Sequence, residues 1–403
     1  MGNAPSMRRS LAAMSLVSVC LGAVALTAAT GVLDRDGGEA TAASSAAKKR
    51  NVALVANAFA GTVDVIEQRS LHRVERIDVA PDYRDCVGDA APGDAAECVA
   101  QNQLSAEGTL ILVDDVAASP DGRILYASRP SLGDVAAFRL KTERLLWRVG
   151  ITGQRPDHLA LSPDGARLLV SAREAHGVEV IDTRSATVVD RFPAGHRPHG
   201  NEYSEDGEHV YNGSIGHGMA ANAEECRCWL TIVDAETMDV ERVIEFDQGV
   251  RPFAVMPEGN RTYIQLSRLN GLVEYSLAED RALRTLRLPL TEGATPPGPD
   301  ADPRAATHHG IALNDDRTKI CAAGSISDYV AIVRRRSLSV KAIIPVGDEP
   351  AWATSSVNGR YCFVPNKQSD DVSVISYREA AEVARIEVGE HPNRIRAARV
   401  RLP

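Results

Sequence analysis

Short apolar runs rich in β-branched residues alternate with turn-forming residues along most of the chain. Residues 155–182 show the unit: an Arg-Pro-Asp-His segment, a Ser-Pro-Asp-Gly turn at 162–165, an apolar run at 166–172 and a second run at 178–182. Proline presets φ, aspartate caps nearby backbone N–H groups and glycine accepts positive φ. The pattern therefore predicts short antiparallel strands joined by tight turns.

The same unit recurs along the chain. Turn glycines at positions 122, 165, 207 and 259 mark four copies, and positions 317 and 359 mark two further copies. In the copy at 317 an arginine stands where the glycine is expected. Repeats of roughly 40–50 residues that contain several short strands are typical of propeller blades.

The two ends of this repeat complement each other. The run at 51–67 has no preceding Pro-containing segment, whereas residues 389–395, Gly-Glu-His-Pro-Asn-Arg-Ile, form such a segment with no blade after it. We therefore expect residues 395–400 to supply the innermost strand of the blade that begins at Asn51. The predicted fold is an all-β, seven-bladed propeller of four-stranded antiparallel blades, closed by the C-terminal strand.

The segments that precede the repeat turns resemble those of a known family of propellers. Ile-Pro-Val-Gly at 344–347 and Ile-Glu-Val-Gly at 386–389, together with the Ser-Pro-Asp-Gly turns, resemble the YVTN-type seven-bladed propellers of bacterial and archaeal envelope proteins. The resemblance covers about residues 51–403 and implies the fold. Similar propellers occur as exported binding proteins, lactonases, and domains of amine dehydrogenases and of haem- or copper-containing reductases, so it implies no single activity.

Residues 1–48 read as a targeting segment. Arg8 and Arg9 precede an apolar stretch at 10–32, which is typical of a cleaved export signal or an uncleaved N-terminal anchor, followed by a linker. Residues 49–403 are the predicted propeller, with insertions at 81–107, 215–227 and 289–307. We expect an extracytoplasmic monomer, secreted, periplasmic or in the cell envelope, that touches a membrane only through such an anchor.

Composition narrows the classes of partner. The chain has 403 residues, 44% of them hydrophobic, and a net charge of -9. A nucleic-acid-binding surface needs a concentrated basic face, and none is evident. Aromatic residues make up only 4%, which argues against a broad sugar-stacking platform. The expected partners are a small-molecule ligand or an envelope protein.

Four cysteines lie in or beside the insertions. Cys86 and Cys98 bracket the Gly- and Ala-rich part of the first insertion, and an oxidising compartment favours a disulfide between them. Cys226 and Cys228 leave three alternatives open: a local disulfide, bonds to other cysteines, or thiolates that bind a soft metal.

The two remaining cysteines of the propeller lie in predicted second strands of adjacent blades. Their positions relative to the turn place Cys321 and Cys362 on opposite faces of their blades. We therefore expect both to be buried thiols.

Histidines gather in the segments that lead into the innermost strands. Alignment of the blades on the turn position makes His199, His309 and Asp157 equivalent, with His158 one residue further on. Strands of a propeller that share a position in the blade begin around one mouth of the central channel. The candidate metal ligands are His158, His199, His217 and His309, with His308 as a substitute. The candidate ligand-binding residues are Asp115, Asp157, Glu202, Trp352 and Arg394.

Several uses of this constellation remain open. Neutral imidazoles suit copper, zinc or iron. The same residues also suit acid–base chemistry or anion capture, with Arg394, Arg197 and Arg251 near the mouth. In a further alternative the protein is a non-catalytic envelope scaffold and the histidines are incidental. No motif of a known catalytic class is present, so the sequence leaves open whether the protein is an enzyme.

Overall fold

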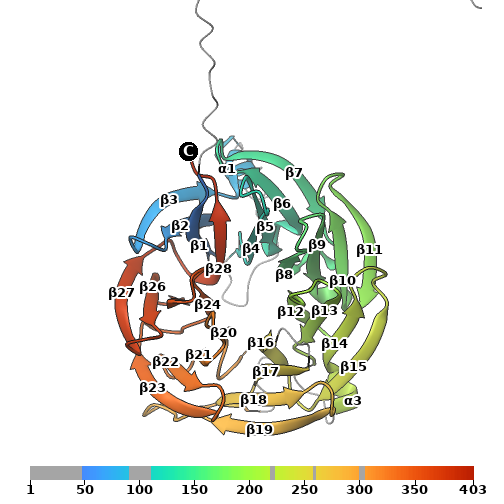
Figure 1. Cartoon of the computed structure of the whole chain (residues 1–403). Helices are drawn as coiled ribbons and strands as arrows, with labels where there is room; N and C mark the ends of the chain where they lie inside the picture. The colour runs from blue at the N-terminus through green and yellow to red at the C-terminus, as the bar shows by residue number, and fades with distance from the viewer. Residues whose placement is uncertain (1–47, 90–109, 218–222, 257–259, 299–304) are drawn as a thin grey trace, which may run out of the picture. The chain divides into compact units, whose positions relative to one another are not determined.

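The propeller predicted from the repeats is confirmed. The computed structural model describes residues 48–89, 110–217, 223–256, 260–298 and 305–403. The chain divides into two compact units, Met1–Ala46 and Ala47–Pro403, and the described residues belong to the second. In that unit seven four-stranded antiparallel sheets form a ring around a central channel (Figure 1).

Each blade contributes an innermost strand to the channel and then a second strand. The innermost strands, from the first blade to the seventh, are β28 (Pro392–Val400), β4 (Val116–Ala118), β8 (Pro156–Leu161), β12 (Pro198–Tyr203), β16 (Val250–Val255), β20 (Ile311–Leu313) and β24 (Thr354–Ser355). The second strands are β1 (Arg50–Asn57), β5 (Ile124–Arg129), β9 (Arg167–Ala172), β13 (His209–Ser214), β17 (Arg261–Leu266), β21 (Lys319–Gly324) and β25 (Tyr361–Asn366).

A third and an outer strand complete each blade. The third strands are β2 (Thr62–Glu67), β6 (Asp134–Arg139), β10 (Gly177–Asp182), β14 (Cys228–Asp234), β18 (Gly271–Ser276), β22 (Tyr329–Arg334) and β26 (Asp371–Ser376). The outer strands are β3 (His72–Asp78), β7 (Arg144–Gly150), β11 (Thr187–Pro193), β15 (Val240–Phe246), β19 (Arg281–Arg287), β23 (Ser339–Pro345) and β27 (Ala381–Glu387).

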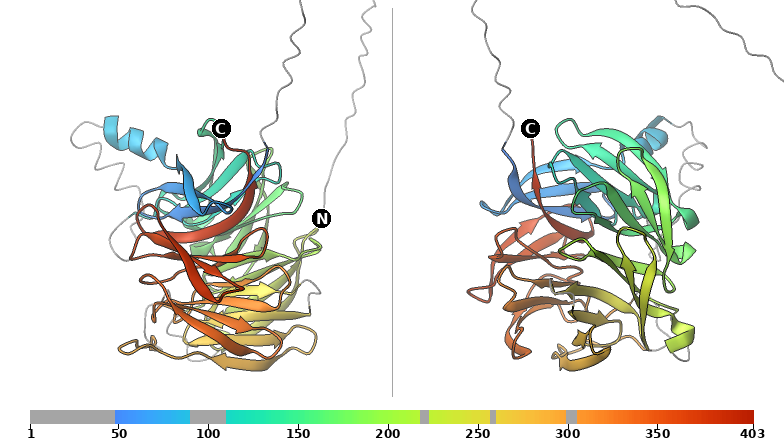
Figure 2. Two further views of the ribbon diagram at one scale, coloured as in Figure 1. Left: turned by 60° about the vertical axis from the view of Figure 1, so that its left-hand side comes forward. Right: turned by 45° about the vertical axis from the view of Figure 1, so that its right-hand side comes forward.

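The ring closes through its C-terminal strand. β28 pairs antiparallel with β1, with Val55 opposite Ile395 and Val52 opposite Ala398. Figure 2 shows the red C-terminal strand lying beside the blue β1. The predicted closure is therefore correct.

Apolar side chains fill the spaces between blades. The described residues form seven buried clusters, and each joins two neighbouring blades. The cluster between the first two blades, for example, contains Leu54 of β1 and Phe138 of β6. Because a blade is covered on both faces, its second and third strands are buried almost throughout, whereas outer strands such as β11 are largely exposed.

The turn between the innermost and second strands explains the sequence repeat. In the third blade, Ser162 Oγ donates to Asp164 Oδ1 (2.6 Å) and accepts from the backbone N–H of Arg167 (2.9 Å), and Gly165 has φ +77°. Arg317 adopts the same left-handed conformation, with φ +52°. The arginine thus occupies the glycine position of the turn, as the spacing indicated.

The short helices lie in the connections between strands, either within one blade or between two adjacent blades. α1 (Pro81–Asp89) follows β3, and α3 (Ala223–Cys226) precedes β14. Three-residue 3₁₀ helices follow β5, β7 and β9: η1 (Pro130–Leu132), η2 (Thr152–Gln154) and η3 (Arg173–Ala175). None of the helices in the described ranges is long and apolar enough to cross a membrane.

One cysteine prediction is wrong. Cys321 and Cys362 are not free thiols but form a disulfide between β21 and β25. Cys321 and Cys362 do lie on opposite faces of their own blades. When two blades stack, however, one face of the first blade packs against the opposite face of the second. Both therefore belong to the same buried cluster.

The remaining cysteines divide between described and undescribed segments. Cys226 and Cys228 pair with each other in a local disulfide, one of the three alternatives left open. The predicted Cys86–Cys98 bond involves Cys98, which lies outside the described residues. The two disulfides are typical of proteins that fold in an oxidising compartment.

Candidate functional site

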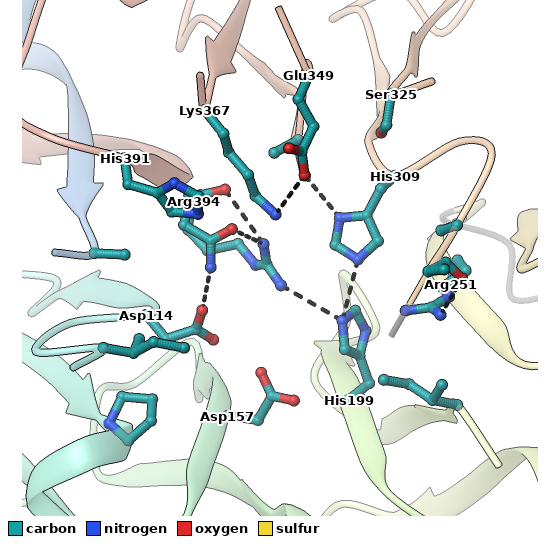
Figure 3. Close-up of a pocket in the computed structure, with 18 of the residues that line it drawn as sticks. Asp114, Asp157, His199, Arg251, His309, Ser325, Glu349, Lys367, His391 and Arg394 are labelled. Atoms are coloured by element: carbon teal, nitrogen blue, oxygen red, sulfur yellow. Dashed lines mark hydrogen bonds and ion pairs between the residues drawn. The ribbon is translucent and has the colours of Figure 1, made fainter. Parts of the chain in front are cut away.

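The innermost strands begin around one cavity of about 510 Å³ at a mouth of the channel. Asp157 and His199 are the second residues of β8 and β12, Arg394 lies at the start of β28, and His309 precedes β20. Figure 3 shows these side chains converging from different blades. Equivalent positions are related by rotation about the channel, so residues more than a hundred positions apart share one site.

Three imidazoles meet at this mouth. His199 Nε2 lies 3.1 Å from His158 Nε2 and 3.2 Å from His309 Nε2. His158 and His199 are almost completely buried. His199 Nε2 thus lies within 3.2 Å of both other Nε2 atoms, while the group whose ligand atoms all lie within 4.8 Å of one another consists of Asp157, His158 and His199.

The outer ring nitrogens show which tautomers are present. His158 Nδ1 lies 3.2 Å from a carboxylate oxygen of Asp115, and His309 Nδ1 lies 2.7 Å from the carbonyl oxygen of Ala351. Both oxygens can only accept, which favours a proton on each Nδ1, although Arg394 Nε, which can only donate, also lies 3.1 Å from His158 Nδ1. The lone pairs of His158 Nε2 and His309 Nε2 therefore point at His199.

His199 cannot satisfy both neighbours. A neutral imidazole carries one N–H, so His199 Nε2 can donate to only one of the two lone pairs. Its own Nδ1 is buried without a hydrogen-bond partner among the described residues. The imidazoles therefore cannot satisfy one another's inward nitrogens by themselves.

All three imidazoles are neutral at ordinary pH. Burial, followed by the positive charge of Arg394, lowers the pKa of His158 to about 4. Burial also holds the pKa of His199 and of His309 well below the usual value, with Arg394 adding to the effect in both. Neutral imidazole is the form that ligates metals.

Carboxyl groups surround the histidines. Asp115 is fully buried and accepts from Arg396 Nε at 3.0 Å, and the neighbouring cations hold its pKa below the usual range against the cost of burial. Asp157 Oδ1 lies 3.6 Å from His158 Nε2. Burial and the nearby charge of Asp114 raise the pKa of Asp157 to about 8.

Arg394 and Trp352 cover one side of the imidazoles. The Trp352 ring stacks on His158 with centroids 4.9 Å apart, and the Arg394 guanidinium lies 4.6 Å from the Trp352 ring. Arg394 Nη2 also donates to His158 Nε2 and lies 3.4 Å from His199 Nε2. A cationic group thus already reaches the inward lone pairs.

Seven of the predicted site residues come together here: Asp115, Asp157, His158, His199, His309, Trp352 and Arg394. The irregular pairing of β8 with β9 between Pro156 and Leu159 breaks the usual alternation of side chains. This irregularity allows two successive residues, Asp157 and His158, to face the same point.

Three other predicted residues lie elsewhere. His217 is exposed, with its ring 6.2 Å from that of His196, and it does not line the described part of the cavity. His308 points to the opposite side from His309, because neighbours in an extended chain alternate, and its Nε2 meets the Tyr329 hydroxyl at 3.2 Å. Glu202 lines a second cavity near the far ends of the inner strands.

The repeat also contains two columns of charged residues that line the cavity. The residues that precede the proline of the inner-strand segment include Arg155, Arg251, Glu349 and His391, and all four line the cavity. The residues that directly follow the second strands also line the cavity, and they include Arg173 and Lys367. Alignment of these two columns would have identified the charged rim.

The fold and the site together define a class: a seven-bladed β-propeller whose channel mouth holds a His/Asp group that could bind a metal. No family model matches the chain, and no curated protein matches it. A solved structure described as Kuenenia stuttgartiensis hydrazine synthase matches with a TM-score of 0.46 and 19% identity, covering 68% of this chain and 97% of that chain. The YVTN-type family therefore stays a resemblance of sequence.

Proposed function

We propose that the channel mouth binds a transition-metal ion through Asp157, His158 and His199, whose ligand atoms all lie within 4.8 Å of one another, with His309 as a neighbouring imidazole. The observation that carries the proposal is the close grouping of Asp157, His158 and His199, together with the oxygen partners on the outer nitrogens of His158 and of the neighbouring His309. Ligating histidines in proteins usually have their other nitrogen bonded to a carboxylate or a backbone carbonyl. Asp115 and the Ala351 carbonyl supply those two kinds of partner.

The donor set favours copper, zinc or iron over calcium or magnesium, because imidazole nitrogen is preferred by the former and oxygen ligands by the latter. A bound ion would act there as a Lewis acid or, for copper and iron, as a redox centre. Trp352 and the inner strands shield one side of the site, while the cavity gives access from the other.

Arg394 lowers the expected metal affinity of the site. Its guanidinium donates to His158 Nε2, the same lone pair that an ion would use. The ion and the guanidinium therefore compete, and binding requires the Arg394 side chain to move away from His158. The ionised Asp114 compensates part of the added charge, and Asp157, whose pKa is raised to about 8, would release its proton when it ligates the ion.

Metal content tests the proposal directly. Protein purified without a histidine tag should contain close to one copper, zinc or iron ion per chain, and Co²⁺ added to chelator-treated protein should give visible d–d absorption. His199→Ala combined with His309→Ala should abolish both signals, because it removes one imidazole of the proposed site and the imidazole that contacts it.

A matched control separates this site from an exposed one. Asp206, Glu208 and His209 form a second, largely exposed group that could hold an ion. His209→Ala should leave both metal content and Co²⁺ absorption unchanged. Metal that persists in the His199/His309 variant, or that disappears with His209→Ala, would contradict the proposed site.

A further inference from the structure

The cavity next to the proposed metal site is richer in positive charge than the chain around it. Its lining includes five arginine or lysine side chains and three carboxyl groups, although the whole chain carries a net charge of -9. The cationic side chains are Arg155, Arg173, Arg251, Lys367 and Arg394. A cleft lined by an excess of one sign raises the local concentration of ligands of the opposite sign.

Several of these cations already have protein partners. Lys367 Nζ pairs with Glu349 at 3.3 Å, and Arg251 donates to Ser267 Oγ at 2.9 Å. Arg394 is held against Trp352 and His158. The positive charges of these three side chains are therefore already engaged by other groups of the protein.

Arg155 is different. It is half-buried, and within the described ranges its guanidinium makes no hydrogen bond or ion pair with an acidic group. Burial and then the charge of the neighbouring Arg173 lower its pKa, and the carboxyl groups of Asp157, Asp114 and Glu174 offset this only in part. A partly buried guanidinium beside a second one costs free energy unless an anion joins them.

The guanidinium of Arg173 has N–H donors that are not fully used by other protein groups. Its nearest carboxylate contacts, to Asp157 (3.7 Å) and Glu174 (3.8 Å), are longer than hydrogen bonds. Its Nε is buried without a hydrogen-bond partner among the described residues. The Arg173 backbone N–H donates to the Arg155 carbonyl oxygen at 3.2 Å, which holds the two residues side by side.

We infer that Arg155 and Arg173 form a subsite for the carboxylate group of a small organic acid. Two planar guanidinium groups offer paired N–H donors that match the two oxygens of a carboxylate. A cavity of about 510 Å³ accommodates a small molecule of this kind. The ionised Asp114 and Glu349 in the same lining oppose a more highly charged phosphate group.

The subsite adjoins the three histidines. One carboxyl group, that of Asp157, separates them: its Oδ2 faces Arg173 and its Oδ1 faces His158. A carboxylate held by the two arginines therefore directs the rest of the ligand toward the imidazoles. This last step rests on the proposed function, whereas the arginine subsite itself does not.

Isothermal titration calorimetry with acetate, malonate and inorganic phosphate tests the subsite, with acetamide as the uncharged analogue. Wild-type protein should bind the two carboxylates at pH 7 more tightly than phosphate and should not bind acetamide. Arg155→Gln should weaken carboxylate binding about tenfold or more, since a charge-assisted pair is lost. Arg155→Lys should restore part of the affinity.

The repeat offers a matched control. Arg197 is equivalent to Arg155 in the next blade but does not line the described part of the cavity. Arg197→Gln should therefore leave carboxylate affinity unchanged. Equal losses in the Arg155→Gln and Arg197→Gln variants, no carboxylate binding in the wild type, or tighter binding of phosphate would each overturn the inference.

The two proposals fail separately. Acetate affinity should persist in the His199→Ala, His309→Ala variant, because the arginines remain. Acetate binding by a protein that takes up no metal would refute the metal site alone. Metal uptake without carboxylate binding would refute the arginine subsite alone.

Discussion

Burial of ionisable groups at single residues makes the stability of this protein depend on pH. The pKa of His158 is lowered to about 4 and that of His308 to about 3, both chiefly by burial. His199 and His309 are lowered as well. Burial acts in the opposite direction on two carboxyl groups and raises the pKa of Asp157 and of Glu202 to about 8.

These shifts predict a stability maximum near pH 6.5 for metal-free protein. From about pH 4.5 to 6.5, these groups in the folded state lack four histidine protons and hold two extra carboxyl protons, so they bind two fewer than in the unfolded state and stability rises with pH. The pKa of His196 is also lowered, which acts in the same direction. From about pH 6.5 to 8 only the carboxyl groups differ, and stability falls. Each net proton changes the unfolding free energy by about 1.4 kcal/mol per pH unit. Urea titrations across this range measure both limbs.

Two variants test which residues cause the acid and alkaline parts of this pH dependence. Glu202→Gln should reduce the alkaline slope by about half, since one of two groups is removed. His308→Gln, away from the metal site, should reduce the acid slope for the same reason. A stability that changes in one direction only between pH 5 and 8 would contradict this account.

At the scale of the element, a buried ion cluster fastens α1 to the second blade. Arg129 at the end of β5 is fully buried. Its Nη1 donates to Asp82 of α1 at 2.6 Å, and its Nε donates to Asp134 of β6 at 2.7 Å. The first insertion is thus held at its base by one guanidinium shared between two carboxylates.

Arg129→Met should destabilise the protein by about 3 kcal/mol or more, because it leaves two carboxylates without their buried partner. Arg148 provides the control: it contacts the same two carboxylates but its side chain is 49% exposed. Arg148→Met should cost less than about 1 kcal/mol. Urea unfolding of the two variants measures the difference, and similar losses would show that burial does not set the strength of this cluster.

At the scale of the whole molecule, stability depends on a ring that the two ends of the chain complete together. β28 fills the inner position of the first blade, and Ile395 and Val400 enter two different inter-blade clusters. The same strand carries Arg394 and Arg396 to the site. The strand that closes the ring thus also supplies two arginines of the site.

Deletion of residues 390–403 should open the ring, because β1 loses its partner and exposes an unpaired edge. We expect aggregation and loss of a cooperative unfolding transition, measured by light scattering and circular dichroism. Deletion of residues 1–47 is the control and should leave a soluble, cooperatively folding propeller. A soluble and cooperative protein that lacks residues 390–403 would refute closure by β28.

The sequence by itself determined the architecture. Turn chemistry is local: Ser162, Asp164 and Gly165 make their contacts within one turn, so their recurrence reports the number of blades and the starts of the inner strands. The incomplete repeats at the two ends predicted the closure. Equivalence of His199 and His309 in the repeat likewise predicted a common mouth, because equivalent positions are related by rotation.

Only the tertiary structure decided which side chains meet. The direction of His158 depends on an irregular pairing within β8, and the disulfide of Cys321 depends on which face of the next blade is pressed against it. His217, in a long connection, follows no repeat and lies beside His196 instead. Local spacing specifies each blade, but contacts between blades depend on stacking and loop paths, which join residues far apart in the chain.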